Sequence, residues 1–430
     1  MRKRSLGEWL QYLEQLHPSK IDLGLSRVSQ VAQRLGLLPF PARVITVAGT
    51  NGKGSVVYSC ERLLRAAGFK TGRYTSPHVL RYNERIAVNA QATEDAVILL
   101  AFEAIESARQ DISLTYFEFA TLAALWVFRE ESVDVALLEV GLGGRLDAVN
   151  IVDCDVAVVT AIDLDHQAWL GDTVDRIAPE KAAIARREKP LILAEPSYPS
   201  TLFTTLDAIG AKVLQAGKAW HWKPLPDAKS LELSLTAGQD PITIPIPDGL
   251  RAANVAAAVR AGACLFDDEP LLREAAQSLA DLHVPARRQR FVLGGRELLL
   301  DVAHNPAAMT ALVEYLELHP VAGKTVAVLG LMSDKDLDAM TQSLARSVDG
   351  ACALAIVGID RAQAPERVWE ALDTAGIAIV QAEFSAAAVW SQLWAGTGQG
   401  DRIVVCGSFY SVAGIIEELL ERGLISSHIE

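Results

Sequence analysis

The sequence lacks the features that mark a secreted, membrane-spanning or nucleic-acid-binding chain. Its five cysteines are odd in number, widely scattered and without a C-x-x-C pair, which indicates buried thiols in a reducing compartment rather than disulfides or a zinc site. No apolar run reaches membrane-spanning length, and the basic start MRKR leads into a stretch interrupted by charged residues, unlike a signal peptide. A net charge of −13 argues against a nucleic-acid-binding face. We therefore expect a cytoplasmic protein that binds neither membrane nor nucleic acid.

Internal repeats and low-complexity tracts are also missing, which excludes solenoid and disordered classes. The 430 residues suffice for two or three domains. Half of them are apolar and 22% are charged, as in an ordinary globular enzyme. The acidic balance still allows anionic small substrates, because a binding site needs only local positive charge.

The strongest local signal is VITVAGTNGKGSVVY at residues 44–58. Its β-branched start predicts a strand and its end a helix, so the glycine-rich turn between them would present backbone N–H groups to phosphate. The spacing departs from G-x-x-x-x-G-K-[ST], because Val47 stands where the first glycine would be and Gly54 separates Lys53 from Ser55. A tight turn without a ligand is the alternative to the ATP site that we favour. The predicted contacts are Thr50, Asn51, Gly52, Lys53, Gly54 and Ser55, the last also to Mg²⁺.

Two near-continuous apolar runs, residues 133–141 and 155–163, are typical of parallel strands covered on both faces. Ligands of such open sheets bind beyond the carboxyl ends of the strands. The first run ends at Glu139, and the second continues into Asp163 and His166. These side chains are therefore candidates for a site beside the glycine-rich turn.

The remaining pattern predicts an α/β protein of two domains. Residues 1–285 would form an N-terminal P-loop ATPase-type doubly wound sheet with a functional loop at 71–90 and a small antiparallel insertion at 230–246. The pattern restarts near PARRQ, so residues 286–430 would form a C-terminal Rossmann-like α/β domain. Helices are expected at 8–16, 26–37, 94–110, 117–130, 173–187, 251–266, 270–283, 306–318, 336–347, 364–375, 385–395 and 410–421, and C-terminal strands at 298–303, 325–331, 352–357, 377–380 and 402–406.

Six motifs follow one another over nearly the whole chain: VAGTNGKGS, TSPHVLRYNERI, LEVGLGGRLDAVN, DLDHQAWLG with PEKAAI behind it, DVAHNP and VCGSFYSVAG. Together they resemble the folylpolyglutamate synthase and dihydrofolate synthase family, relatives of the Mur peptidoglycan ligases. LHPSKIDLGLSRV and SLTYFEF resemble the bifunctional bacterial members in particular. The resemblance implies a monomeric ligase in which ATP phosphorylates the carboxylate of dihydropteroate or a tetrahydrofolate. The amino group of L-glutamate then displaces phosphate from the acyl phosphate.

The resemblance also implies two Mg²⁺ ions, held in the family at the positions of Ser76, Glu139 and His166. Such ions would neutralise the repulsion between ATP and a carboxylate. The residues alone leave alternatives open: Glu139 could be a capping carboxylate without a metal, and His166 could have a structural or general-base role, since Mg²⁺ prefers oxygen.

Lys181 corresponds to a family position that carries a carbamylated lysine, an anionic oxygen ligand for the second metal. The alternative is a lysine on a helix surface, paired with Glu180. With Lys53 on the phosphates, the catalytic residues implied are Lys53, His166 and Lys181.

Pterin recognition in the family would use aromatic rings for stacking and a carboxylate to accept N–H groups. The aromatic residues at 116, 117 and 119 could equally be core, and Arg81 could be a solvated loop arginine. The substrate-binding residues carried over are Ile21, Asp22, Leu23, Arg81, Thr115, Tyr116, Phe117, Glu118, Leu146, Asp147, Ala148 and His304.

Nucleotide contacts outside the turn would be Asn254, Arg287 and Asp301. Here the chain departs from the family, because PARRQ replaces the usual P-G-R-F-Q and leaves Arg287 and Arg288 as alternatives. Alignment by the proline and glutamine favours Arg287. Lys335 and Ser408 are candidates for the glutamate side.

Two other functions compete with this interpretation. One is a Mur-type ligase acting on a nucleotide-linked muramyl peptide, and the short segment expected before the glycine-rich turn, without a separate nucleotide-sugar domain, counts against it. An ATP-dependent switch would release phosphate in response to a protein partner, whereas a ligase would release it in response to glutamate.

Overall fold

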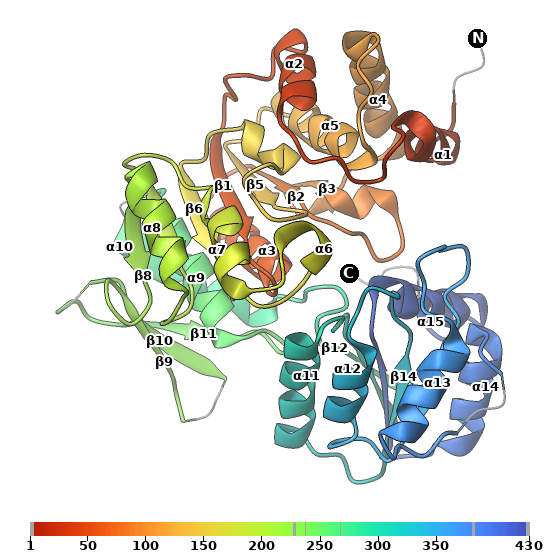
Figure 1. Cartoon of the computed structure of the whole chain (residues 1–430). Helices are drawn as coiled ribbons and strands as arrows, with labels where there is room; N and C mark the ends of the chain where they lie inside the picture. Colours follow the sequence, from red (N-terminus) through yellow and green to blue (C-terminus); the bar gives the residue numbers. More distant parts are fainter. Residues whose placement is uncertain (1–3, 227–228, 237, 267, 381–382, 427–430) are drawn as a thin grey trace. The chain divides into compact units, whose positions relative to one another are not determined.

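The computed structural model describes residues 4–226, 229–236, 238–266, 268–380 and 383–426. The chain divides into two compact units, Met1–Leu282 and His283–Glu430. Each has its own sheet (Figure 1). The α/β class expected from the sequence is confirmed in both.

The first unit is built on an eight-stranded sheet in the order β4-β3-β2-β5-β1-β6-β7-β8. The six strands from β2 to β8 along this order run parallel, while β3 and β4 add an antiparallel edge. Val47 of β1 pairs with Glu139 of β5, so both strands end at the same level. The strands are β1 (Arg43–Ala48), β2 (Thr71–Tyr74), β3 (Ile86–Val88), β4 (Gln91–Ala92), β5 (Val135–Glu139), β6 (Val156–Val159), β7 (Pro190–Leu193) and β8 (Lys212–Gln215).

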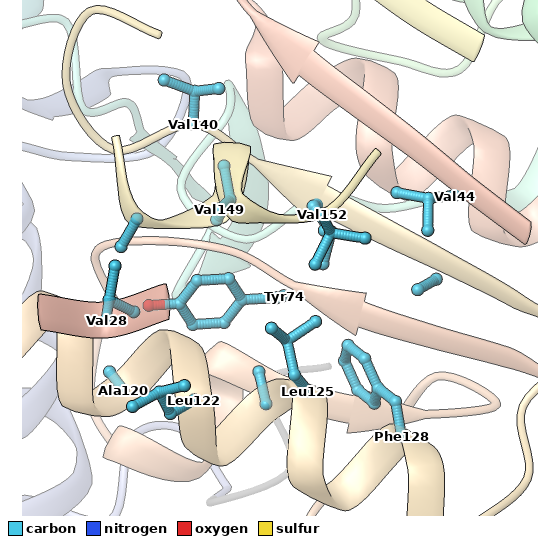
Figure 2. Packing of buried hydrophobic residues seen from close by; sticks show 14 of the residues in the cluster. Val28, Val44, Tyr74, Ala120, Leu122, Leu125, Phe128, Val140, Val149 and Val152 are labelled. Carbon is cyan, nitrogen blue, oxygen red and sulfur yellow. The ribbon is translucent and has the colours of Figure 1, made fainter. Parts of the chain in front are cut away.

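Helices cover both faces of this sheet. On one face, α1, α2, α4 and α5 share a buried cluster with alternate strand residues such as Val44 and Tyr74. Figure 2 shows the Tyr74 ring lying between the helix that carries Leu122 and the segment that carries Val149. The other face is packed by α3 and α9, which contact each other. The helices of this unit are α1 (Leu6–Leu16), α2 (Ser26–Arg34), α3 (Lys53–Ala66), α4 (Asp95–Arg109), α5 (Tyr116–Glu130), α6 (Gln167–Leu170), α7 (Val174–Ala182), α8 (Ser200–Ile209), α9 (Ala252–Gly262) and α10 (Glu269–Gln277), with 3-10 turns η1 (Tyr82–Arg85), η2 (Ala148–Ile151) and η3 (Ser278–Asp281).

A separate three-stranded sheet confirms the antiparallel insertion expected at 230–246, of which residue 237 lies outside the described part of the chain. It consists of β9 (His221–Pro224), β10 (Ser230–Ser234) and β11 (Ile242–Pro245). Its alternating inward residues Leu231 and Leu233 are fully buried, as expected for a sheet with one covered face.

The second unit contains a five-stranded sheet in the order β12-β13-β16-β14-β15, parallel except for the edge strand β12. The sequence did not predict this edge strand, because the first strand expected after PARRQ was the one at 298–303. The prediction of a strand at 377–380 is wrong, because this segment has only an isolated bridge between Ile379 and Ala351. The elements are β12 (Gln289–Leu293), β13 (Arg296–Leu300), β14 (Thr325–Leu329), β15 (Gly350–Ala353), β16 (Arg402–Cys406), α11 (Pro306–Leu318), α12 (Leu337–Leu344), α13 (Pro365–Thr374), α14 (Ala386–Gly396) and α15 (Phe409–Glu421).

Residues 71–90 are only partly the irregular loop that the sequence suggested, since they contain β2, η1 and β3. The sequence pattern did not predict β2, because this strand contains a buried charged residue. Arg73 Nε lies 2.6 Å from Glu61 Oε2, and both side chains are almost fully buried. A charged residue in a strand breaks the apolar run that pattern reading depends on.

All five cysteines are free thiols. Within the described ranges, every helix is too short or too polar to cross a membrane.

Candidate active site

The glycine-rich turn leads from β1 directly into α3. Gly52 forms the N-cap of α3 with φ +93°, a conformation that side chains rarely adopt. Because a glycine cap has no side chain, the first N–H groups of the helix keep their capacity to bind an anion.

Two close approaches require glycine in this turn. A Cβ on Gly49 would lie 1.8 Å from Thr160 Oγ1, and a Cβ on Gly52 would lie 2.5 Å from Asn254 Nδ2. Asn254, on α9, is buried, and its Oδ1 atom has no hydrogen-bond partner among the described residues. A buried acceptor of this kind favours a ligand donor at this point.

Hydrogen bonds connect the glycine-rich turn to the segment that follows β6. Thr50 N donates to Ala161 O at 2.8 Å, and Asn51 forms an isolated bridge with the same residue. Thr50 Oγ1 donates to Asp163 O and accepts from Asp163 N, both at 3.0 Å. The two segments that the sequence singled out are therefore neighbours in the structure.

Two lysine ammonium groups meet at one backbone carbonyl. Lys53 Nζ donates to Gly49 O and to Thr50 O, both at 3.1 Å, and Lys181 Nζ donates to Gly49 O at 2.9 Å. Burial, and then the charge of Lys53, lower the pKa of Lys181 to about 7. A substantial fraction of Lys181 is therefore a neutral amine near neutral pH.

The interpretation of Lys181 as a surface lysine paired with Glu180 is wrong. Lys181 is buried, whereas Glu180 Oε1 lies 2.9 Å from Arg145 Nε. The two residues are adjacent on α7, but the Lys181 side chain reaches Gly49 of the glycine-rich turn and the Glu180 side chain reaches Arg145.

Glu139 lies at the end of β5 with its carboxylate buried beside the turn. Its Oε2 atom accepts from Ser76 N at 3.2 Å and lies 3.7 Å from the Cβ position of Gly54. Ser55, the next residue of α3, is also buried. The structure thus brings Glu139, Ser76 and the start of α3 together, and this set offers the oxygen atoms that Mg²⁺ prefers.

His166 is the N-cap of α6, with φ +51°. Its backbone N donates to Asp165 Oδ1 at 2.8 Å, and its Nε2 atom lies 3.9 Å from Asp165 Oδ2. In the described residues, no three His, Cys, Asp or Glu side chains form a cluster that could hold a metal on their own. A metal site here would therefore need serine oxygens or ligand oxygens as well.

Asp147 is buried in the loop after β5. Its Oδ2 accepts from Leu142 N at 2.8 Å and its Oδ1 from Val149 N at 3.1 Å. Burial raises the pKa of Asp147 to about 6, against the lowering effect of these N–H groups and of Lys53. Leu146 is half-buried and Ala148 buried on either side of it.

The segment from Thr115 to Glu118, predicted to bind the pterin, forms the N-cap and first turn of α5. Thr115 and Glu118 form a capping box, with Thr115 N donating to Glu118 Oε2 at 2.8 Å. The Phe117 ring packs against Gly141, where a Cβ would lie 2.6 Å from Phe117 Cζ. Tyr116 contacts Tyr82 edge to face at 6.1 Å. Of the two predicted stacking residues, Phe117 therefore packs against the loop that follows Glu139.

The N-terminal segment Ile21–Leu23 is half-buried and connects α1 to α2. Asp22 Oδ2 accepts from Arg27 Nη1 at 2.7 Å, and Arg27 Nη2 lies 3.2 Å from Glu118 Oε1. Sequence reasoning missed Arg27, because no spacing rule links it to a residue as distant in sequence as Glu118. Arg81, by contrast, is exposed, and its backbone N donates to Glu84 Oε1.

In the second unit, Asp301 is buried at the end of β13. Its Oδ2 accepts from Arg288 N at 3.1 Å and its Oδ1 from Ala303 N at 2.7 Å. Burial raises the pKa of Asp301, opposed by the charges of Arg288 and Arg287. His304 Nδ1 lies 2.8 Å from Val302 O.

The two candidate arginines differ in their surroundings. Arg288 Nη2 donates to Ala311 O at 2.9 Å, whereas the Arg287 guanidinium lies 5.3 Å from the centre of the Phe409 ring. Of the glutamate candidates, the Lys335 ammonium lies 3.5 Å from Asp334, and Ser408 is the N-cap of α15.

Both units match known domain families. Residues 47–261 match the Mur ligase middle domain, and residues 286–409 match the Mur ligase, glutamate ligase domain. The two family matches and the α/β fold thus define a ligase of the Mur type.

Similarity extends over nearly the full chain. The dihydrofolate synthase/folylpolyglutamate synthase of Escherichia coli (strain K12) is 42% identical over 96% of this chain and 95% of that protein. The chain belongs to the dihydrofolate synthase/folylpolyglutamate synthase family.

Solved structures of proteins of the same family are also similar to this chain. Escherichia coli FolC in complex with DHPP and ADP is 41% identical with a TM-score of 0.90, covering 98% of this chain and 99% of that one. A bifunctional folylpolyglutamate synthase/dihydrofolate synthase with Mn, AMPPNP and L-glutamate bound is 38% identical with a TM-score of 0.88, covering 97% and 98%.

Proposed function

We propose that this chain is an ATP-dependent ligase that adds L-glutamate to 7,8-dihydropteroate, forming dihydrofolate, and to reduced folates, forming folylpolyglutamates. The observation that carries the proposal is the convergence of the Lys53 and Lys181 side chains and a buried carboxylate on one glycine-rich turn. This arrangement suits a reaction that brings a nucleotide and a carboxylate together. The relatives of known structure, in complex with DHPP and ADP or with AMPPNP and L-glutamate bound, support the same assignment.

The chemistry has two steps. An oxygen of the substrate carboxylate attacks the γ-phosphorus of ATP, which releases ADP and leaves an acyl phosphate. The neutral amino group of L-glutamate then attacks the acyl carbon, the C–O bond to phosphate breaks, and the nitrogen loses one proton as the amide forms and phosphate leaves. Phosphorylation is needed because a carboxylate alone would have to expel oxide.

The nucleotide would be bound by the turn from Thr50 to Ser55, with Lys53 as the point charge on the phosphates. Asn254 supports this placement through its buried, unpartnered Oδ1 atom. From the second unit, Asp301 and Arg287 would contribute. Arg287 is preferred to Arg288 because the guanidinium of Arg288 is already bonded to Ala311 O.

Two Mg²⁺ ions would be held by Ser55, Ser76, Glu139, His166 and a carbamylated Lys181. The oxygen atoms gathered around Glu139 fit a divalent cation. The metal would supply charge neutralisation of the phosphates. The residues of the chain orient the donors: Ser76 N holds one oxygen of Glu139, and Asp165 holds the backbone of His166.

Carbamylation of Lys181 requires its neutral amine, which attacks CO₂ and loses one proton to give an N-carboxylate. The lowered pKa of Lys181, about 7, makes that amine available. A crystal grown with bicarbonate should have density for three further atoms beyond Nζ. A bare side chain under those conditions would contradict the modification.

The pterin would lie against Ile21–Leu23, Thr115–Glu118 and Leu146–Ala148, with Arg81 and His304 as further substrate contacts. Glu118 Oε1 is buried without a hydrogen-bond partner among the described residues, so it can accept a pterin N–H group. We further propose that the protein acts as a monomer in the cytoplasm.

Product analysis tests the proposal. Purified protein should convert dihydropteroate, in the presence of ATP, Mg²⁺ and L-glutamate, to a product heavier by one glutamyl residue in mass spectrometry. Omitting glutamate should abolish the product. A protein that hydrolyses ATP without forming any glutamylated product would contradict the proposal.

A further inference from the structure

An ion-pair network links two of the three segments proposed to bind the pterin, and it is centred on Arg27 of α2. The Arg27 guanidinium donates through Nη1 to Asp22 Oδ2 at 2.7 Å and through Nη2 to Asp22 O at 2.8 Å. Its Nη2 atom also lies 3.2 Å from Glu118 Oε1. One side chain thus joins the connection between α1 and α2 to the first turn of α5.

The burial of the partners makes this network more than a surface contact. The Glu118 side chain is 4% exposed and that of Arg27 is 25% exposed. The Arg27 Nε and Glu118 Oε1 atoms are buried and have no hydrogen-bond partner in the described part of the chain. A carboxylate in such a position is stabilised by the cation beside it, while its second oxygen is committed to the capping box with Thr115.

The planar guanidinium group explains why an arginine, rather than a lysine, is needed at position 27 to make these contacts. Two terminal nitrogens serve two acceptors of Asp22 and face a carboxylate from another helix, whereas a lysine could offer only a single point charge. His17 Nε2 lies 3.3 Å from the same Asp22 oxygen, so it is a second neighbour of this carboxylate.

We propose that Arg27 is a positioning residue that fixes the Ile21–Leu23 segment against the start of α5 and thereby sets the affinity for the pterin part of the substrate. Arg27 acts through Asp22 and Glu118 rather than on the reacting atoms. The inference rests on the proposed function, because it takes both segments to be parts of the pterin site.

The test compares Arg27→Gln and Arg27→Lys with Arg34→Gln, a matched control on the same helix. Arg34 donates to the backbone carbonyls of Ala108 and Arg109 at 3.0 and 3.1 Å and has no part in the network. Binding of 7,8-dihydropteroate in the presence of ADP would be measured by calorimetry, together with steady-state kinetics and thermal melting.

Arg27→Gln should raise the Kd and the KM for dihydropteroate about tenfold, with the KM for ATP unchanged. Arg27→Lys should recover only part of the loss, and Arg34→Gln should behave as the wild type. In the double variant Asp22→Asn/Arg27→Gln, the fold-loss of affinity should be smaller than the product of the two single losses, because both substitutions break the same Asp22–Arg27 contact.

The binding measurement distinguishes a failure of the proposed function from a failure of the inference about Arg27. Wild-type protein that does not bind dihydropteroate overturns the proposed function and the inference with it. Wild-type protein that binds, with an Arg27→Gln variant of equal affinity, overturns the inference alone. If Arg27→Gln melts early, the same comparison is made with Arg27→Lys, for which affinity equal to the wild type is the contradicting result.

Discussion

At the residue scale, Lys53 and Lys181 both donate to the carbonyl of Gly49, and the burial of Lys181, with the charge of Lys53 beside it, determines the chemistry of Lys181. The sequence predicted the importance of Lys53 from its place in the glycine-rich turn. It could not predict the burial of Lys181, because a lysine beside a glutamate on a helix is usually solvated. Only the packing of α7 against the turn distinguishes the two environments.

The pKa of Lys181 predicts how stability depends on pH. In the folded protein the group loses its proton near pH 7, whereas in the unfolded chain it keeps the proton to its ordinary pKa of 10.5. Between these values the unfolded state binds more protons, so the free energy of unfolding should rise with pH. Below pH 7 both states are protonated, and the cost of burying the charge is fully present.

The measurement compares wild-type protein with Lys181→Met by urea unfolding, in CO₂-free buffer with a chelator, from pH 7 to pH 10. The stability of the wild type should rise relative to that of the variant over this range. A constant difference would mean that Lys181 is not buried as described.

Glu139→Gln keeps the size of the side chain and removes its charge. If Glu139 is a metal ligand, the Mg²⁺ concentration needed for half-maximal activity should rise about tenfold or more. Glu131→Gln is the control, because Glu131 is an exposed carboxylate paired with Lys70. An unchanged Mg²⁺ titration of Glu139→Gln would remove this residue from the metal site.

At the element scale, β1, β5, β6, β13, β14, β15 and β16, the glycine-rich turn and most helices could be predicted from apolar periodicity and turn residues, whereas β7, α8 and β8 were not predicted. The failures have physical causes. β2 was hidden by the buried pair of Arg73 and Glu61, and β12 is an edge strand whose residues alternate between half-buried and exposed. Tertiary contacts such as that of Phe117 with Gly141 have no signature in one sequence.

The turn itself can be tested with two alanine substitutions. Gly52→Ala introduces a Cβ 2.5 Å from Asn254 Nδ2 at φ +93°, so the loop must shift, and the KM for ATP should rise at least tenfold. Gly54→Ala places its Cβ at an ordinary contact distance of 3.7 Å from Glu139 Oε2 and should cause a smaller loss. Equal effects of the two substitutions would contradict the described shape of the turn.

At the scale of the whole molecule, the chain forms two units, each with a buried core and a sheet of its own. The sequence predicted two domains because the strand and helix pattern restarts after the helical end of the first. The proposed functional residues are divided between them: the glycine-rich turn belongs to the first unit, and Arg287 and Asp301 to the second.

Residues 1–285 expressed alone should fold, because the first unit has a complete core, and should bind ADP through the glycine-rich turn. They should not form product, since Arg287 and Asp301 are missing. Circular dichroism, calorimetric titration with ADP and the ligase assay would measure these properties. Full ligase activity in the fragment would contradict a role for the second unit.

The most direct test of ligase function is the release of phosphate from ATP in the presence of Mg²⁺, with and without L-glutamate. The two acceptors, 7,8-dihydropteroate and tetrahydrofolate, would be offered in separate reactions. We predict phosphate release that depends on glutamate with both acceptors. Release that is independent of glutamate, or its absence in folded protein that binds ATP, would contradict a folate–glutamate ligase.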